Sequence, residues 1–276
     1  LSVPPVACTN SKNGAYFVWE DLRSTDSSKI YFKEIDSLRS PKGSSHGNPV
    51  AMNAFTQYQP SVTEDGTGGI IVVWQNRNGS SFDIYAQRID SNRNKMWTEA
   101  GIPICISTGT QQHPKVINDS SGGFIIVWED KRSGSNEHIY AQKVNLSGTI
   151  QWAANGIPVC TAGGRHYNFD VIALAASGCV VSWQDTRNTN SDIFAQRISS
   201  TGTMSWTVNG LAVCDQTNEQ TDVDMCLSGT NVTLFTWADN RSGHSDIYIQ
   251  RFNSNGSKQF STNGINICNA AGDQRY

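Results

Sequence analysis

The chain has 276 residues, a formal net charge of -3 and an isoelectric point near 5.9. Only 16% of its residues are charged, so it carries no basic field suited to nucleic acid. No apolar run approaches the roughly 20 residues that a helix needs to span a bilayer. We therefore expect neither nucleic-acid binding nor membrane insertion, and the many Asn, Ser, Thr and Gly residues suit an extracellular or cell-surface protein.

One phrase recurs five times along the chain, and its tryptophans fix the period. Trp19, Trp74, Trp128, Trp183 and Trp237 are separated by 55, 54, 55 and 54 residues. A period of this kind is the mark of a repeat architecture and outranks any single residue as a clue. We expect one domain over residues 1–276, with repeats at approximately 1–55, 56–109, 110–164, 165–218 and 219–276.

The second repeat illustrates the elements that each repeat predicts. Its strand-forming runs cover residues 60–65, 70–74, 83–90 and 96–105, separated by turns rich in Gly, Asn, Asp and Ser, and no window has a helical period. The second run is apolar on both faces, which is typical of a strand buried between sheets. The prediction is an all-β fold, a five-bladed β-propeller with four antiparallel strands per blade and about 54–55 residues per repeat.

The two ends of the chain leave the closure of the ring open. Residues 272–276 match the segment that elsewhere precedes the proline of a first strand. Either the ring closes without strand exchange, or the chain is one module of a longer surface protein. We find no signal peptide, so an exported protein would be represented here by its mature form or by a fragment.

The seven cysteines permit two interpretations. Cys214 and Cys226 are 12 residues apart, and counting round the ring places Cys8 12 residues beyond Cys268. These spacings suggest two disulfides, Cys214 with Cys226 and Cys8 with Cys268, in an oxidising compartment. Alternatively, the cysteines are small buried apolar residues. No cluster has the spacing of zinc ligands, so we predict no metal site.

Four of the five recurring tryptophans begin the motif Trp-x-Asp-x-Arg, for example Trp128, Asp130 and Arg132. A catalytic role would not require equivalent copies. An Asp that accepts turn amides and pairs with the Arg would instead close the turn after the second strand. We interpret this motif, and the recurring aromatic and Gln positions of the third and fourth strands, as structural.

The loops that join one repeat to the next share a face with the loops between second and third strands, and binding residues concentrate in such loops. They combine amides with aromatic or His side chains, which can hydrogen-bond to a sugar and stack on it. The alternative is that the recurring Gln side chains cap strand ends. The predicted ligand-binding residues are Gln57, Tyr58, Gln111, His113, His166, Tyr167, Gln274 and Tyr276.

Cleavage of a glycan would need a pair of carboxylates that converge on the substrate. Glu64, Asp170, Asp222 and Asp224 lie in or near first strands, but no two of them form a recognisable local motif. We therefore predict no catalytic residues and no cofactor, and expect that the protein is not an enzyme.

Taken as a whole, the repeat Pro-x-Val, Asp-x-x-Gly-Gly, Trp-x-Asp-x-Arg, Asp-Ile-Tyr-Ala-Gln-Arg and Asn-Gly-Ile-Pro-Val-Cys resembles repeat modules of large secreted and cell-surface proteins of bacteria. It is also distantly similar to TolB-type propeller repeats, to which Asp65-Gly66 and Asp83-Ile84-Tyr85 correspond. The resemblance implies a propeller and an exported setting, with no activity attached.

The leading functional hypothesis is a noncatalytic extracellular propeller for binding or adhesion, whose loops recognise a glycan or a partner protein. The first alternative is a structural or assembly module of a larger surface protein or filament. The second alternative is a glycan-cleaving hydrolase.

Overall fold

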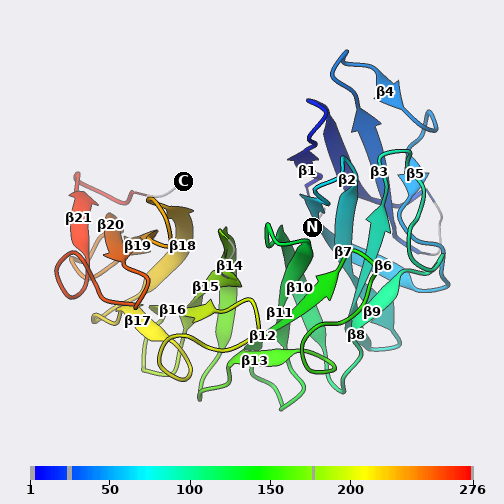
Figure 1. The fold of residues 1–276 in the computed structure, drawn as a ribbon. Helices are drawn as coiled ribbons and strands as arrows, with labels where there is room; N and C mark the ends of the chain where they lie inside the picture. The colour runs from blue at the N-terminus through cyan, green and yellow to red at the C-terminus, as the bar shows by residue number, and fades with distance from the viewer. Residues whose placement is uncertain (1–3, 24–26, 176–177, 275–276) are drawn as a thin grey trace. The chain divides into compact units, whose positions relative to one another are not determined.

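The computed structural model contains five antiparallel sheets that follow one another along the chain (Figure 1). This arrangement confirms the predicted all-β fold class, the five-bladed β-propeller. The chain divides into two compact units, Leu1–Gly134 with Ala141–Ile157, and Ser135–Tyr140 with Pro158–Tyr276. The structure describes residues 4–23, 27–175 and 178–274.

Four of the sheets have four strands each, paired in chain order. Their strands are β6 (Thr56–Glu64), β7 (Ile70–Asn78), β8 (Ser81–Ile89) and β9 (Ile102–Cys105); β10 (Gln111–Asn118), β11 (Gly123–Asp130), β12 (His138–Asn145) and β13 (Ile157–Cys160); β14 (His166–Leu174), β15 (Gly178–Asp185), β16 (Asp192–Ile198) and β17 (Leu211–Cys214); and β18 (Gln220–Leu227), β19 (Thr233–Asp239), β20 (Asp246–Phe252) and β21 (Ile265–Cys268).

The first sheet departs from this pattern in its last strand. It contains β1 (Val6–Thr9), β2 (Ala15–Asp21) and β3 (Lys29–Ile35), and two short pieces, β4 (Pro41–Lys42) and β5 (Asn48–Pro49), that both pair with β3.

Each recurring tryptophan packs on a glycine of its own repeat, just before the last strand, which explains why both residues repeat. Four of the five rings are fully buried or nearly so, and the ring of Trp19 is half-buried. A methyl group on the facing glycine would lie between 2.4 and 2.6 Å from ring atom Cη2, and each glycine has a φ between 79° and 89°. Only glycine meets both conditions without strain. The pairs are Trp19 with Gly47, Trp74 with Gly101, Trp128 with Gly156, Trp183 with Gly210, and Trp237 with Gly264.

The fourth strands are shorter than the sequence predicts, because a side chain from the third strand holds the preceding segment in a turn. In the second repeat, Gln87 accepts a hydrogen bond from the Trp97 amide at 3.0 Å and donates to the Thr98 carbonyl at 2.6 Å. Gln142, Gln196 and Gln250 make the same two bonds in later repeats. In the first repeat this position is Lys33, and there the fourth strand is divided into β4 and β5.

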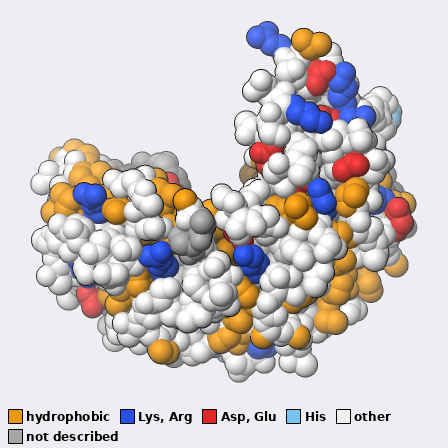
Figure 2. Space-filling model, in the orientation of Figure 1, with side chains coloured by type: hydrophobic (Ala, Val, Ile, Leu, Met, Phe, Trp, Pro, Cys, Tyr) orange, Lys and Arg blue, Asp and Glu red, His pale blue; other side chains and the backbone are white. Residues whose placement is uncertain are grey.

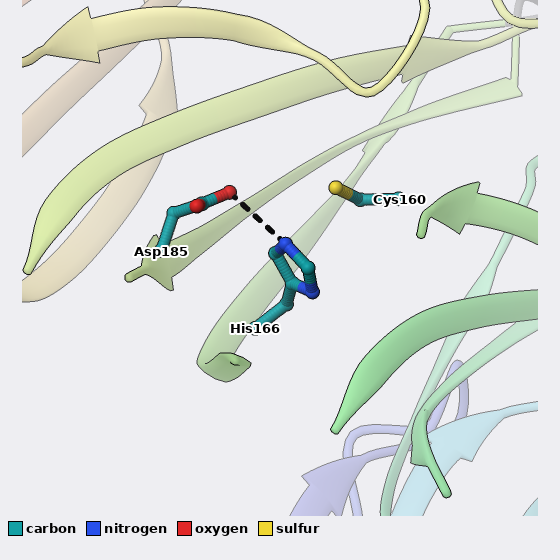
Figure 3. Close-up of side chains that lie close together, drawn as sticks. All are labelled: Cys160, His166 and Asp185. Atoms are coloured by element: carbon teal, nitrogen blue, oxygen red, sulfur yellow. Dashed lines mark ion pairs between the residues drawn. The ribbon is translucent and has the colours of Figure 1, made fainter. Parts of the chain in front are cut away.

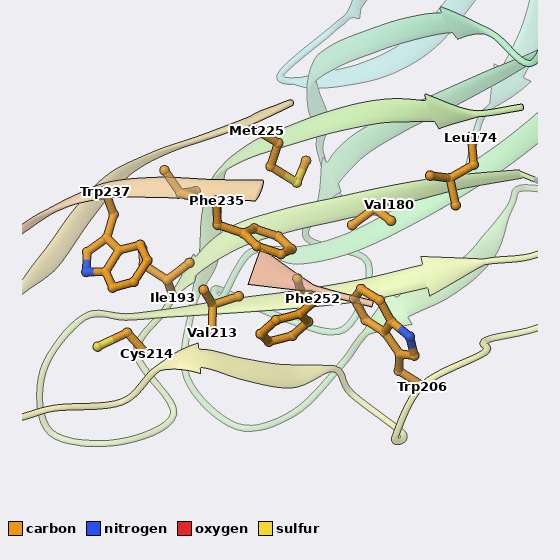
Figure 4. Close-up of a cluster of buried hydrophobic side chains, with 12 residues drawn as sticks. Leu174, Val180, Ile193, Trp206, Val213, Cys214, Met225, Phe235, Trp237 and Phe252 are labelled. Carbon is orange, nitrogen blue, oxygen red and sulfur yellow. The ribbon is translucent and has the colours of Figure 1, made fainter. Parts of the chain in front are cut away.

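The core of the second unit shows how the apolar strand faces are used (Figure 4). Phe235 and Phe252 meet edge to face at 5.0 Å between ring centroids, and Trp206 packs against Phe252 at 5.5 Å. Val213 and Ile193 belong to the same cluster and are fully buried. Aromatic pairs of this kind contribute packing area and directional contacts, so the recurring aromatics are structural here.

All seven cysteines are free thiols, so the predicted disulfides of Cys214 with Cys226 and of Cys8 with Cys268 are not formed. Cys214 is fully buried with its Sγ 3.0 Å from a guanidinium nitrogen of Arg241, whereas Cys226 is exposed on β18. Their side chains thus occupy different environments. Burial raises the pKa of the Cys8 and Cys214 thiols to about 12, which keeps them protonated.

The surface reflects the low charge of the sequence. Figure 2 shows a face on which charged side chains are scattered and most of the area belongs to uncharged polar side chains and backbone. In the described part of the chain, no helix is long and apolar enough to cross a membrane.

Candidate functional site

The Trp-x-Asp-x-Arg motif builds a closed polar cluster, as predicted from its recurrence. In the third repeat Asp130 accepts hydrogen bonds from the indole of Trp128 at 2.8 Å and from the backbone amide of Arg132 at 2.8 Å. The guanidinium of Arg132 also pairs with this carboxylate at 2.6 Å and contacts the Cys105 sulfur at 3.2 Å. The same contacts recur around Asp185 and Asp239. Because they are repeated, we assign them the structural role of closing the turn rather than a catalytic role.

In the fourth repeat the cluster gains a histidine. Cys160, His166 and Asp185 point toward one another with their ligand atoms within 4.8 Å, and His166 Nε2 lies 3.4 Å from Asp185 Oδ2 (Figure 3). The set does not suit a metal ion, because Arg187 already places its guanidinium 2.5 Å from Asp185 and 3.2 Å from the Cys160 sulfur. Burial also raises the pKa of Cys160 to about 11, whereas a metal ligand must be a thiolate.

A second recurring feature is a β-bulge near the start of each first strand from the second repeat onward. The pairing register of the first two strands shifts there in four sheets, and one residue of each bulge that is not glycine adopts a positive φ. Backbone strain of this kind is concentrated at functional sites, and bulges re-aim side chains. The four residues are Gln59, His113, Asn168 and Asp222.

At the bulge of the third repeat the side chain meets a buried carboxylate. His113 Nδ1 lies 2.7 Å from Glu129 Oε2, and the side chain of His113 is 46% exposed while that of Glu129 is 6% exposed. A buried carboxylate that orients an exposed imidazole can support proton transfer. The equivalent pair of the fourth repeat is uncharged, since Asn168 donates to Gln184 at 2.8 Å.

The predicted ligand-binding residues fall into two groups. The side chains of Gln57, Gln111 and His166 are fully buried, and Gln57 accepts a hydrogen bond from the Ile30 amide at 2.9 Å. Gln111 and Gln274 donate to carbonyls of their own loops, as strand-end caps do.

Two predicted aromatic residues are more accessible. Tyr58 is half-buried and lies edge-on to Phe82 at 5.8 Å, and Tyr167 stacks under Arg165 at 4.8 Å. Tyr276 lies outside the described residues. Ligand contact by the eight predicted residues stays a prediction.

A polar cavity of about 780 Å³ opens among the loops of the last two repeats. Both predicted loop sets contribute to it, namely the loops between repeats and those between second and third strands. Amide and hydroxyl side chains dominate the lining, together with two carboxylates. The lining residues are Thr189, Asn190, Thr217, Asn218, Glu219, Asn240, Gly243, His244 and Asp273.

The two carboxylates of the cavity, Glu219 and Asp273, occupy equivalent positions in successive repeats. Glu219 Oε2 accepts a hydrogen bond from the Ser191 amide at 3.1 Å, and Asp273 Oδ1 accepts one from the Ser245 amide at 3.1 Å. The sequence interpretation named neither as a site residue. The available signal was a departure from the repeat, because Thr56, Thr110 and Arg165 stand at the same position in the earlier repeats.

No protein-family model matches the chain, and no curated relative was found. Solved structures do share its fold. A protein of unknown function from Dyadobacter fermentans is 10% identical, with a TM-score of 0.60 over 96% of this chain and 82% of that one. An ulvan lyase of polysaccharide lyase family 25, bound to GlcA(1-4)Rha3S, is 10% identical, with a TM-score of 0.64 over 95% and 68%.

A third structure is a Hadza microbial sialidase, 13% identical, with a TM-score of 0.55 over 93% of this chain and 57% of that one, so the chain spans little more than half of its length. The expectation that the protein is not an enzyme is contradicted by these findings, because glycan-cleaving enzymes are prominent among the structures with this fold. At such low identity the likeness shows the fold alone.

Proposed function

We propose that the protein binds a glycan in the polar cavity of the last two repeats and cleaves it, with Glu219 and Asp273 as the acid and base pair. The observation that carries the proposal is that two carboxylates line one cavity of about 780 Å³ whose other walls are amides and hydroxyls. Small-molecule sites of this volume, with a few fixed polar groups, are typical binding sites. The fold shared with a sialidase and an ulvan lyase supports the glycan assignment.

Hydrolysis of a glycosidic bond needs two carboxyl groups in different states. One is protonated and donates its proton to the leaving oxygen, while the other is ionised and either activates water or attacks the anomeric carbon. Water is consumed, its hydroxyl going to the anomeric carbon and its proton restoring the acid. The backbone amides that bond to Glu219 and Asp273 fix one oxygen of each group, which limits the motion of both carboxylates.

We also propose an extracellular or cell-surface setting. The support is compositional: 16% of residues are charged, and the face in Figure 2 is mostly uncharged. The described thiols are free, so a setting outside the cell does not depend on disulfides.

The test is release of reducing ends from a panel of polysaccharides by the intact chain and by Glu219→Gln and Asp273→Asn. We expect each substitution to lower the rate by about 10²-fold or more, the usual contribution of a proton-transfer group. His113→Gln is the comparison variant. If it abolishes activity while both cavity variants keep theirs, the chemistry belongs to the His113 and Glu129 pair and the assignment to the cavity is wrong.

A further inference from the structure

The charged side chains around the cavity of the last two repeats determine which kinds of sugar it can bind. Among the described residues that line it there are two carboxylates and one histidine, and no Lys or Arg. Protein sites for carboxylate, sulfate or phosphate groups use Arg or Lys, often in bidentate contacts. A uronate or sulfated sugar would be repelled by Glu219 and Asp273, and no Lys or Arg among the described lining residues offsets that repulsion.

We infer, on the basis of the proposed function, that this cavity is a subsite for an uncharged sugar unit and that it discriminates against uronic, sialic and sulfated units. The hydrogen-bonding groups match an uncharged ligand, because amide and hydroxyl side chains both donate to and accept from sugar hydroxyls. Thr189, Thr217, Asn218 and Asn240 supply such groups at the cavity wall.

The wall is also held in place before a ligand arrives. The side-chain amide of Asn190 donates to the carbonyls of Gln216 at 2.9 Å and Asn218 at 2.6 Å, and to the carboxylate of Asp192 at 2.9 Å. Asn218 has a φ of 65° and donates to the Asn240 carbonyl at 3.3 Å. A preorganised wall lowers the entropy that binding must offset.

The preceding junction between repeats shows the opposite charge at the same place. Arg165 stands where Glu219 does, and it pairs with Glu137 at 2.7 Å; Glu137 in turn stands where Ser191 does. The fold therefore accommodates a cation at this position, and the last two repeats have an anion instead. This contrast identifies the position of Glu219 as one at which the charge of the cavity is set, alongside Asp273.

The experiment uses an array of neutral oligosaccharides, each printed beside its counterpart oxidised at C6 or sulfated. We expect the intact protein to bind the neutral member of each matched pair more tightly, by about tenfold, the size of carboxylate repulsion at an exposed site. Raising the salt concentration should narrow this preference, since salt screens exposed charges.

The decisive variant is Glu219→Arg, which copies the charge found at Arg165. It should weaken binding of neutral members about tenfold and admit their carboxylated counterparts. Glu99→Arg makes the same charge change at an exposed residue that does not line the cavity and should leave the preference unchanged.

The outcomes separate the two proposals. Equal or tighter binding of the oxidised or sulfated members by the intact protein overturns the neutral-sugar inference and leaves glycan binding standing. Loss of the neutral preference in Glu99→Arg overturns it as well, because the charge would then act from elsewhere. Binding to no member of the array overturns the proposed function itself.

Discussion

Replacing His166 by Gln tests whether this buried histidine is a structural substitute for the glutamine of the other repeats. Burial is the main cause that lowers the pKa of His166 from 6.5 to about 4, and nearby Asp185 opposes the shift. In the unfolded chain the imidazole takes up a proton near pH 6.5, but in the folded chain it does so only near pH 4. The unfolded state therefore binds more protons in this window, and stability is lost as the pH falls through it.

The shift of about 2.5 pH units corresponds to about 3 kcal/mol once both states are protonated. Because Gln does not titrate, His166→Gln should match the unmodified protein within about 1 kcal/mol at pH 7. At pH 4 the variant should be the more stable by up to about 3 kcal/mol. Urea unfolding, followed by the fluorescence of the eight tryptophans, measures both values. A stability difference that is the same at the two pH values would refute this account of His166.

Three further predictions concern stability and thiol chemistry. Asp239→Asn should cost about 3 kcal/mol in urea unfolding, because it removes the buried carboxylate that pairs with the partly buried guanidinium of Arg241; a loss under 1 kcal/mol would contradict the structural role of the turn. Gly210→Ala and Gly229→Ala both place a side chain at a φ near 90°, but only the first meets a buried ring, at 2.5 Å. Thermal unfolding should thus show the larger loss for Gly210→Ala, and equal losses would mean that the backbone alone is responsible. In the native protein an alkylating reagent should label the exposed Cys226, which a disulfide would prevent.

The fold could be predicted because one local solution is repeated five times. Each Trp needs a glycine opposite it, so Trp74 and Gly101 recur together, and a single repeat already contains both halves of the contact. The ends of the strands could be predicted less well from the sequence. The role of Gln87 in holding a turn before β9 depends on its side chain reaching a segment ten residues away, which apolar periodicity does not indicate.

The candidate site was only partly predictable, for a related reason. Reasoning from recurrence selected Gln57 and Gln111, whose recurrence reflects a capping role for buried amides. It pointed to the inter-repeat loops, some of which line the cavity, but passed over Glu219 and Asp273, which break the pattern. The pairing of His113 with Glu129 depends on a bulge that shifts the register, and no spacing in the sequence indicates it.

The central claim is that the two cavity carboxylates cleave a glycan. The most direct measurement is reducing-end release from the best-bound neutral polysaccharide by the intact chain and by the double variant Glu219→Gln, Asp273→Asn. The account predicts turnover by the intact chain and its loss in the double variant, with sugar binding retained on the array. Undiminished turnover in the double variant, or binding without any cleavage by the intact chain, would contradict it.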